Sequence, residues 1–295
     1  MSYSHSVLGY SAALLSGFAW ALGSILFRNL GEKITPLGLA LGKSLIGVVY
    51  LGAVMLVVGL EPVDPASLVM LSVSGVIGIA IGDTLFFRAL NTLGPRLTVM
   101  IGTLGPVVTV AMAVILLGER PSLLSWSGIC MVIAGVTWVV LESLPEDGSA
   151  VDKRRGVKYA LLATVCMSSG IIFAKLGLTE GSPLQAAFIR LAAGIAGLTI
   201  LGIFRGSLGA WLKPFTEPGV LKSAFFSVFV VIFGGFWLFL VSLKYVDASI
   251  AGVLNSTEPL FVLPLVSLFL REKISIRSIV GSVVAVAGVV LIFLA

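Results

Sequence analysis

An internal repeat limits the folds open to this chain more than any other feature of its sequence. One pair of blocks aligns at a constant offset and matches Gly23, Arg28, Pro36 and Lys43 to Gly170, Lys175, Pro183 and Arg190. A second pair, at a slightly larger offset, matches Gly82, Pro106, Glu119 and Gly128 to Gly235, Pro259, Glu272 and Gly281. Self-similarity over most of a chain indicates that its two halves fold into the same arrangement of elements.

The composition places the chain in a lipid bilayer. Hydrophobic residues make up 58% of it and charged residues 11%, whereas a soluble domain carries roughly 25% charged residues. The net charge of +5 does not indicate a nucleic-acid partner, because the basic residues lie in loops and their longest run is residues 153–155. Cys130 and Cys166 lie in apolar segments without a paired spacing, so we expect no metal and no cofactor.

Ten apolar segments have about the 20 residues that a helix needs to cross a bilayer. They are residues 7–27, 36–59, 66–87, 97–117, 123–141, 157–174, 184–204, 220–243, 248–270 and 276–294. The sequence therefore predicts an all-α integral membrane protein with ten transmembrane helices. Residues 1–144 and 157–295 form its two repeats, and the charged residues 145–156 link them. Because each repeat holds an odd number of spans, the repeats must insert in opposite directions, as in many secondary transporters.

The distribution of Lys and Arg predicts which side of the membrane each loop faces. Most basic loop residues lie on one face, and the other face carries Arg120, Lys175 and Lys244. Cytoplasmic loops carry the excess of basic residues, so the crowded face is predicted to be cytoplasmic. Both termini then lie outside, and we expect the protein in the cell (inner) membrane.

Four ionisable residues lie well inside the predicted spans: Lys43, Asp83, Arg190 and Glu258. Each costs about 2.5–3.5 kcal/mol at a helix centre, so we expect them to face the bundle interior or a water-filled cavity. The helical rise places Lys43 roughly 10 Å and Asp83 roughly 6–9 Å below the same face, on consecutive spans. These depths predict an ion pair between Lys43 and Asp83. Arg190 lies roughly 10 Å below the opposite face, and Glu258 roughly 15 Å, near the midplane.

The repeat divides these residues into two kinds. Lys43 and Arg190 are equivalent, which fits either a shared structural role, such as neutralising a carboxylate, or direct contact with a substrate. Asp83 has Phe236 as its counterpart, and it fits either functional contact or structural pairing with Lys43. An unrepeated charge inside the membrane favours a function over packing.

Glu258 also has no charged counterpart, because Gly105 stands in its place in the first half. Pro259 follows it and lacks a backbone donor, so we expect the ninth span to be unwound or kinked there. Trp20 and Trp237 lie in the middle of their spans, where a tryptophan fits lipid-facing or core packing as well as the lining of a cavity.

Two strings of residues carry a family resemblance. The first runs from Pro106 to Glu119 and the second from Pro259 to Glu272, each a Pro followed by an apolar run and a terminal Glu. Together with the stretch Trp20 to Gly23, they resemble the drug/metabolite transporter superfamily, in its ten-span type with two EamA repeats. The second string departs from the family pattern at Arg271, where Gly is usual.

The resemblance implies a basket of helices around a central cavity, with two halves that rock to give alternating access. It also implies export or exchange of amino acids, nucleobases, sugars or related metabolites, often coupled to protons or to counter-substrates. The residues that it would place in the cavity or at its edge are Trp20, Asp83, Trp237, Glu258, Lys43 and Arg190.

The sequence leaves two other classes open, an intramembrane enzyme and a channel or structural membrane protein. The pair Gly82-Asp83 resembles a motif of intramembrane aspartyl proteases, but the required second Asp is missing, since Asp247 lies at a span edge. We therefore predict no enzyme but a secondary transporter of a small polar metabolite, such as an amino acid, with protons as the candidate coupling ion. Asp83 and Glu258 would bind substrate or protons, and a monomer and a homodimer both stay open.

Overall fold

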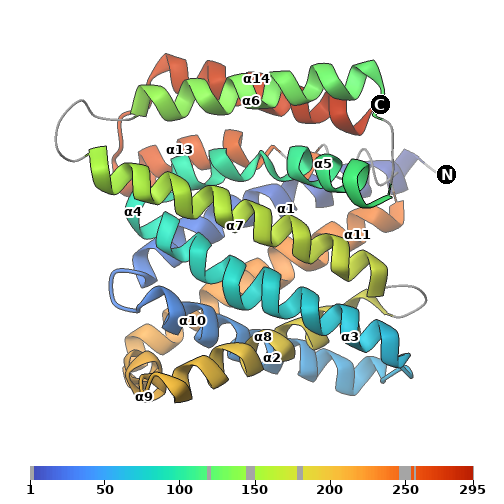
Figure 1. Ribbon diagram of the computed structural model, residues 1–295, viewed down its shortest axis with the longest axis vertical. Helices are drawn as coiled ribbons and strands as arrows, with labels where there is room; N and C mark the ends of the chain where they lie inside the picture. Colours follow the sequence, from blue (N-terminus) through green and yellow to red (C-terminus); the bar gives the residue numbers. More distant parts are fainter. Residues whose placement is uncertain are drawn as a thin grey trace. The chain divides into compact units, whose positions relative to one another are not determined.

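The computed structural model describes residues 3–117, 121–143, 150–177, 182–245, 254–255 and 257–294, and all regular secondary structure in these ranges is helical (Figure 1). The elements are α1 (Tyr3–Leu30), α2 (Pro36–Val58), α3 (Pro65–Ser74), η1 (Gly75–Asp83), α4 (Thr84–Gly102), α5 (Gly105–Leu117), α6 (Leu123–Ser143), α7 (Ala150–Gly177), α8 (Pro183–Phe204), α9 (Leu208–Leu212), η2 (Lys213–Thr216), α10 (Pro218–Phe229), η3 (Val230–Trp237), α11 (Leu238–Tyr245), α13 (Glu258–Leu270) and α14 (Ile276–Phe293). The elements η1 and η3 are π-helices, and η2 is a short 3-10 helix. The predicted all-α fold is confirmed over the described residues.

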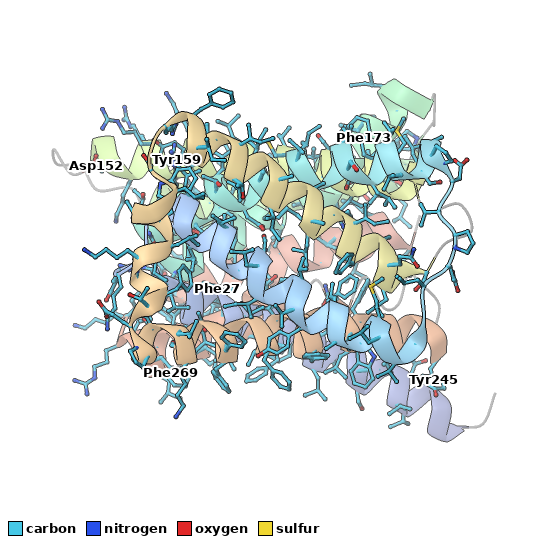
Figure 2. All side chains as sticks on the ribbon, turned by 90° about the horizontal axis from the view of Figure 1, so that it is seen from below. Phe27, Asp152, Tyr159, Phe173, Tyr245 and Phe269 are labelled. Carbon is cyan, nitrogen blue, oxygen red and sulfur yellow. The ribbon has the colours of Figure 1, made fainter. Side chains whose placement is uncertain are left out.

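Seven of the described helical stretches are long and apolar enough to cross a membrane. Two of them join several elements, since residues 65–102 combine α3, η1 and α4, and residues 218–237 combine α10 and η3. Leu56 and Leu123 are each 90% exposed, and Figure 2 shows Phe269 among the many apolar side chains on the helices. A helix with such an outer face suits lipid better than water. The number of crossings and their directions stay predictions.

Polar caps and prolines fix where helices begin. The side chain of Thr35 accepts a hydrogen bond from the backbone N–H of Gly38, and Pro36 is the first residue of α2. Asp64 caps α3 in the same way, before Pro65. The cap satisfies a backbone N–H group at the start of the helix. Proline lacks this group, but at the first helical position the group would have no partner within the helix, so nothing is lost. The predicted start of the second span at Pro36 is confirmed.

The predicted fourth span, residues 97–117, is not one helix. α4 ends at Gly102, α5 begins at Gly105, and a turn lies between them. The helix before it also runs further than predicted, because it continues past residue 87 to a bend at Gly94. Gly94 has a φ of 78°, a conformation that favours glycine, and Pro95 then restarts the helix.

The predicted linker is partly helical. α7 begins at Ala150 and includes the basic residues 153–155, whereas residues 144–149 lie outside the described ranges. Asp152 lies in the first turn of α7 (Figure 2). A carboxylate there stabilises the helix N-terminus through the helix dipole, which explains how a charged segment can begin a helix.

The chain packs into two compact units. The first unit comprises Met1–Leu26, Thr92–Lys158 and Val230–Ala295, and the second comprises Phe27–Asn91 and Tyr159–Phe229. Each unit contains segments from both halves of the sequence repeat. Neither half of the repeat therefore forms a compact unit by itself.

In the first unit, α6 and α14 lie side by side along their lengths (Figure 1). A Cβ atom added at Gly128 would lie 2.6 Å from the carbonyl oxygen of Gly288, and one added at Gly135 would lie 2.6 Å from that of Gly281. The residue number falls on α14 as it rises on α6, so the two helices are antiparallel. The repeat matches Gly128 to Gly281 and Gly135 to Gly288, so these two contacts are equivalent to each other.

In the second unit, α2 packs against α8, and each of the two packs on a further helix, α2 on α10 and α8 on η1. The ring of Tyr50 on α2 lies 6.0 Å from the ring of Phe229 on α10. A Cβ added at Gly197 of α8 would lie 3.7 Å from the side chain of Val76 in η1. Continuing the two offsets of the repeat matches Tyr50 to Gly197 and Val76 to Phe229. The contact between Tyr50 and Phe229 is therefore the repeat equivalent of the contact between Gly197 and Val76.

Candidate functional site

Two π-helices interrupt the membrane helices that carry candidate residues. η1 ends at Asp83, in the third predicted span, and η3 ends at Trp237, in the eighth. The repeat matches Gly82 of η1 to Gly235 of η3, so both interruptions occupy equivalent positions. π-Helical turns inside α-helices are rare and are frequent at functional sites. Local geometry therefore marks the two spans that carry Asp83 and Trp237.

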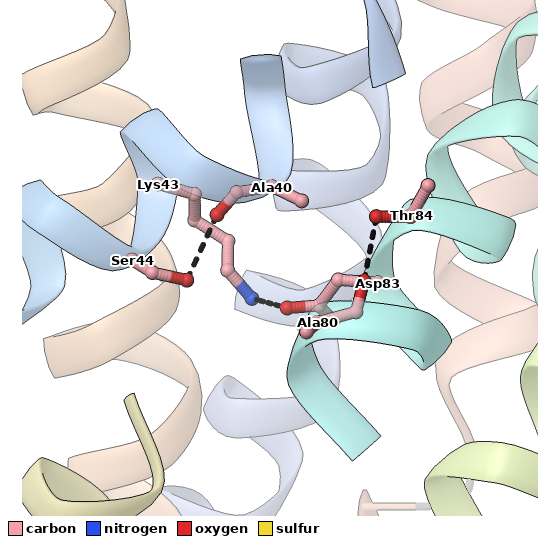
Figure 3. Close-up of polar contacts among 6 residues, drawn as sticks. All are labelled: Ala40, Lys43, Ser44, Ala80, Asp83 and Thr84. Carbon is pink, nitrogen blue, oxygen red and sulfur yellow. Dashed lines mark hydrogen bonds and ion pairs between the residues drawn. The ribbon is translucent and has the colours of Figure 1, made fainter. Parts of the chain in front are cut away.

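Lys43 of α2 forms an ion pair with Asp83 of η1 (Figure 3). Their side chains are 18% and 10% exposed, respectively. The Nζ atom of Lys43 also lies 6.0 Å from the centroid of the Phe87 ring. The ion pair that the depths in the sequence predicted is confirmed. Each charge lowers the cost of placing the other inside the membrane.

The hydroxyl groups beside this pair are satisfied within their own helices. Ser44 donates a hydrogen bond of 2.8 Å to the carbonyl oxygen of Ala40, and Thr84 donates one of 2.6 Å to that of Ala80 (Figure 3). Both bonds reach one turn back along the helix, a common arrangement for Ser and Thr. Lys43 and Asp83 are left to pair with each other.

Arg190 of α8 also lies against η1. Its backbone carbonyl packs against Gly75, and its Nη2 atom lies 3.6 Å from the position of a Cβ at Gly78. Both contacts place Arg190 against the π-helix that ends at Asp83. Its Nε atom is buried and donates no hydrogen bond to any residue that the structure describes. We call Lys43, Asp83 and Arg190 the charge cluster, and all three belong to the second unit.

Glu258 belongs to the first unit and is the first residue of α13. Thr257 before it is not helical, and Pro259 after it is buried. The ninth predicted span is therefore interrupted where the sequence predicted it, although residues 246–253 of that span lie outside the described ranges. The repeat matches Glu258 to Gly105, the first residue of α5, so α5 and α13 begin at equivalent positions.

A polar contact close to Glu258 did not follow from the sequence. The hydroxyl of Ser16 on α1 lies 2.6 Å from the carbonyl oxygen of Gly235 and 2.8 Å from Oδ1 of Asn255. Thr257 donates a hydrogen bond of 2.6 Å to the carbonyl oxygen of Leu254. These contacts join α1 to η3 and to the segment before α13, all within the first unit. The signal in the sequence was the polar run of residues 255–258 inside an apolar span.

The two mid-span tryptophans differ in their surroundings. Trp20 is partly buried, and its Cε2 atom lies 2.9 Å from the position of a Cβ at Gly235. Trp237 is 52% exposed. Packing on η3 accounts for the place of Trp20, and the exposure of Trp237 suits a lipid-facing ring as well as a cavity. A substrate role for either residue stays a prediction.

A model of the EamA-like transporter family matches residues 7–141 and again residues 154–294. The chain belongs to the EamA-like transporter family. The resemblance carried by the two Pro-to-Glu strings is thereby confirmed. Membership, together with the long apolar helices, makes this protein an integral membrane protein of a transporter family. It implies a small-molecule substrate and points to transport rather than to enzymatic catalysis.

Several relatives of this EamA-like chain are themselves named uncharacterized transporters. One from Archaeoglobus fulgidus is 23% identical over 96% of both chains. YyaM of Bacillus subtilis is 23% identical over 74% of this chain and 70% of its own length. A transporter from Acidianus ambivalens is 35% identical over 28% of this chain and 33% of its own length. These names agree on transport and specify no substrate.

The fold of this EamA-like chain also occurs in a protein of known crystal structure. The match covers 99% of this chain and 98% of the chain in that structure, with a TM-score of 0.62 and 21% sequence identity. A likeness at this identity concerns the fold alone. The helical architecture over nearly the full length is therefore shared with a solved structure.

Proposed function

We propose that this EamA-like protein is a secondary transporter that exports or exchanges a small polar metabolite, such as an amino acid, by alternating access. The observation that carries the proposal is the charge cluster, three ionisable side chains brought together on helices of membrane length. Charges at membrane depth are costly and typically mark substrate or ion pathways. Repeated halves with interrupted helices suit alternating access better than a static pore.

The proposed architecture is ten spans in two inverted repeats around a central cavity, in the inner membrane. The reciprocal glycine contacts of α6 and α14 support it, because equivalent helices that run antiparallel cross a membrane in opposite directions. An even number of spans puts both termini on one side, and the Lys and Arg bias puts that side outside. Tags on the two termini test this: labelling of the two tags from opposite sides would overturn the ten-span arrangement.

In this proposal Asp83 and Glu258 bind substrate or protons, and Lys43 and Arg190 set their ionisation. Asp83 pairs with Lys43, and Arg190 packs against the π-helix that ends at Asp83. Glu258 makes no ion pair or hydrogen bond with any residue that the structure describes, which leaves its carboxylate available to a proton or a substrate. Trp20 and Trp237 also contact the substrate in this proposal.

We predict that Glu258→Gln removes proton coupling while leaving exchange in place, because glutamine keeps the shape of the side chain and cannot release a proton. A thermal-shift screen of the purified protein against metabolites first supplies a ligand, since a ligand that binds the native state raises the Tm. Liposomes then measure its accumulation driven by a pH gradient and its exchange without one. The matched control is Glu217→Gln, an exposed carboxylate just before α10.

Accumulation driven by the pH gradient at the wild-type rate in Glu258→Gln would remove Glu258 from the coupling mechanism. Flux that rises in proportion to substrate concentration without saturating would favour a channel over a carrier. A ligand that binds and is chemically converted would favour an enzyme.

A further inference from the structure

The charge cluster is not neutral, since it contains two cations and one carboxylate. The imbalance follows from the repeat. Lys43 and Arg190 are equivalent to each other, but the counterpart of Asp83 is Phe236, so a second carboxylate is missing. An uncompensated charge in a bilayer is unfavourable, and an anion from outside the chain would compensate it.

The two cations of the cluster are satisfied to different degrees. Lys43 contacts the Asp83 carboxylate directly. Arg190 makes no ion pair with any residue that the structure describes, and its buried Nε finds no acceptor there either. A guanidinium carries five N–H donors in a planar fork, and a buried donor without a partner destabilises the protein. The missing acceptor therefore belongs to Arg190 and not to Lys43.

Glycine backbone forms part of the surface beside this guanidinium. The Nη2 atom lies 3.6 Å from where a Cβ at Gly78 would be. Gly78 and Gly170 pass so closely that a Cβ at Gly170 would lie 2.9 Å from the Gly78 Cα. Ser74 donates a hydrogen bond of 2.5 Å to the carbonyl oxygen of Gly170 and fixes this crossing. Neither glycine has a side chain that could cover the fork.

We infer that Arg190 binds an oxyanion of the transported metabolite, a carboxylate or a phosphate group. The planar fork matches either group with two parallel hydrogen bonds, which a lysine ammonium does not offer. Lys43 stays with Asp83, so the anionic group of the ligand goes to Arg190. This inference rests on the proposed transport function and narrows the substrate to an anionic or zwitterionic molecule.

The test measures binding to the purified full-length protein by thermal shift. Acetate and inorganic phosphate serve as minimal oxyanions, and alanine against alaninamide is a matched pair that differs in the carboxylate. We expect acetate or phosphate to raise the Tm, or alanine to raise it while alaninamide does not. Arg190→Gln should weaken that binding at least about tenfold, since charged hydrogen bonds are lost. No response of the wild-type protein to any of the oxyanions would overturn the inference.

Two variants of the ion pair keep the test valid if Arg190→Gln does not fold. Asp83→Asn leaves two cations without a carboxylate, so we expect oxyanions to bind about tenfold more tightly. The double variant Lys43→Gln/Asp83→Asn restores the wild-type net charge of the cluster, so acetate and phosphate, which carry no cationic group for Asp83 to contact, should bind it less tightly than Asp83→Asn. If Arg190 serves stability alone, the dissociation constants will not follow the charge of the cluster, and the inference fails.

Flux separates this inference from the proposed function. A ligand whose transport in liposomes is unchanged by Arg190→Gln would refute the oxyanion site and leave transport in place. An oxyanion that binds through Arg190 but never crosses the membrane would refute the transport proposal and leave the site in place.

Discussion

Asp83→Asn is expected to reduce coupled flux to background and to destabilise the protein by about 3–5 kcal/mol. The reason is that Lys43, whose side chain is 18% exposed, would lose its partner inside a membrane helix. Breaking one partner of a buried pair leaves an uncompensated charge, which costs more than the pair itself contributes. Thermal unfolding in detergent measures the loss of stability, and uptake into liposomes measures the loss of flux.

The matched control removes both charges together. Lys43→Gln/Asp83→Asn leaves no unpaired charge at this position, so we expect its stability to return close to that of the wild type. If Asp83 acts in transport, flux stays lost in the double variant although the fold is restored. Recovery of flux would show instead that Asp83 serves as the structural partner of Lys43.

Gly135→Leu is expected to destabilise the first unit by about 1–3 kcal/mol or more, because α6 must move away from α14 to make room. A Cβ at Gly135 would already lie 2.6 Å from the carbonyl oxygen of Gly281. The neighbouring substitution Ala134→Leu is the control, since Ala134 is exposed on the same helix. Thermal unfolding of the two variants compares a buried and an exposed leucine one residue apart.

The reciprocal variant tests whether the contact behaves as one feature. Gly281→Leu is expected to weaken the same helix pair. Combining it with Gly135→Leu should cost less than the sum of the two, because the first leucine has already separated the helices. Equal stability of Gly135→Leu and Ala134→Leu would show that the close approach of the glycines does not hold α6 against α14.

The positions of most helices could be predicted because lipid demands long apolar segments and polar caps end them. The predicted spans 36–59, 184–204 and 276–294 correspond to α2, α8 and α14 within a residue or so at each end. Thr35 and Ser275, which cap two of these helices, are visible in the sequence. Short loops with Pro or a capping residue leave little freedom in where a helix begins.

The π-helices and the interruption between α4 and α5 could not be predicted. The segment Gly75–Asp83 is apolar nearly all round apart from Asp83, so its hydrophobic pattern does not distinguish a π-helix from an α-helix. The turn between Gly102 and Gly105 also lies inside an apolar run. Both features depend on what packs against the helix, and a single segment does not reveal its neighbours.

The candidate site was predictable where depth alone decides a contact. Lys43 and Asp83 lie at similar depth on consecutive spans, and they pair. The approach of Arg190 to η1 depends on how α8 packs against that helix, and it did not follow from depth. The contact of Ser16 with Asn255 joins residues far apart in the chain and was likewise hidden.

Each compact unit contains segments from both halves of the chain, so neither unit can be completed until the second half has been synthesised. A ribosome delivers α2 and η1 long before α8, which packs on both, and it delivers α6 before α14, the last described helix of the chain. The first half therefore enters the membrane with its glycine-lined faces still unpartnered. A gene cut in the linker should yield two fragments that are degraded when expressed singly and rescued when expressed together.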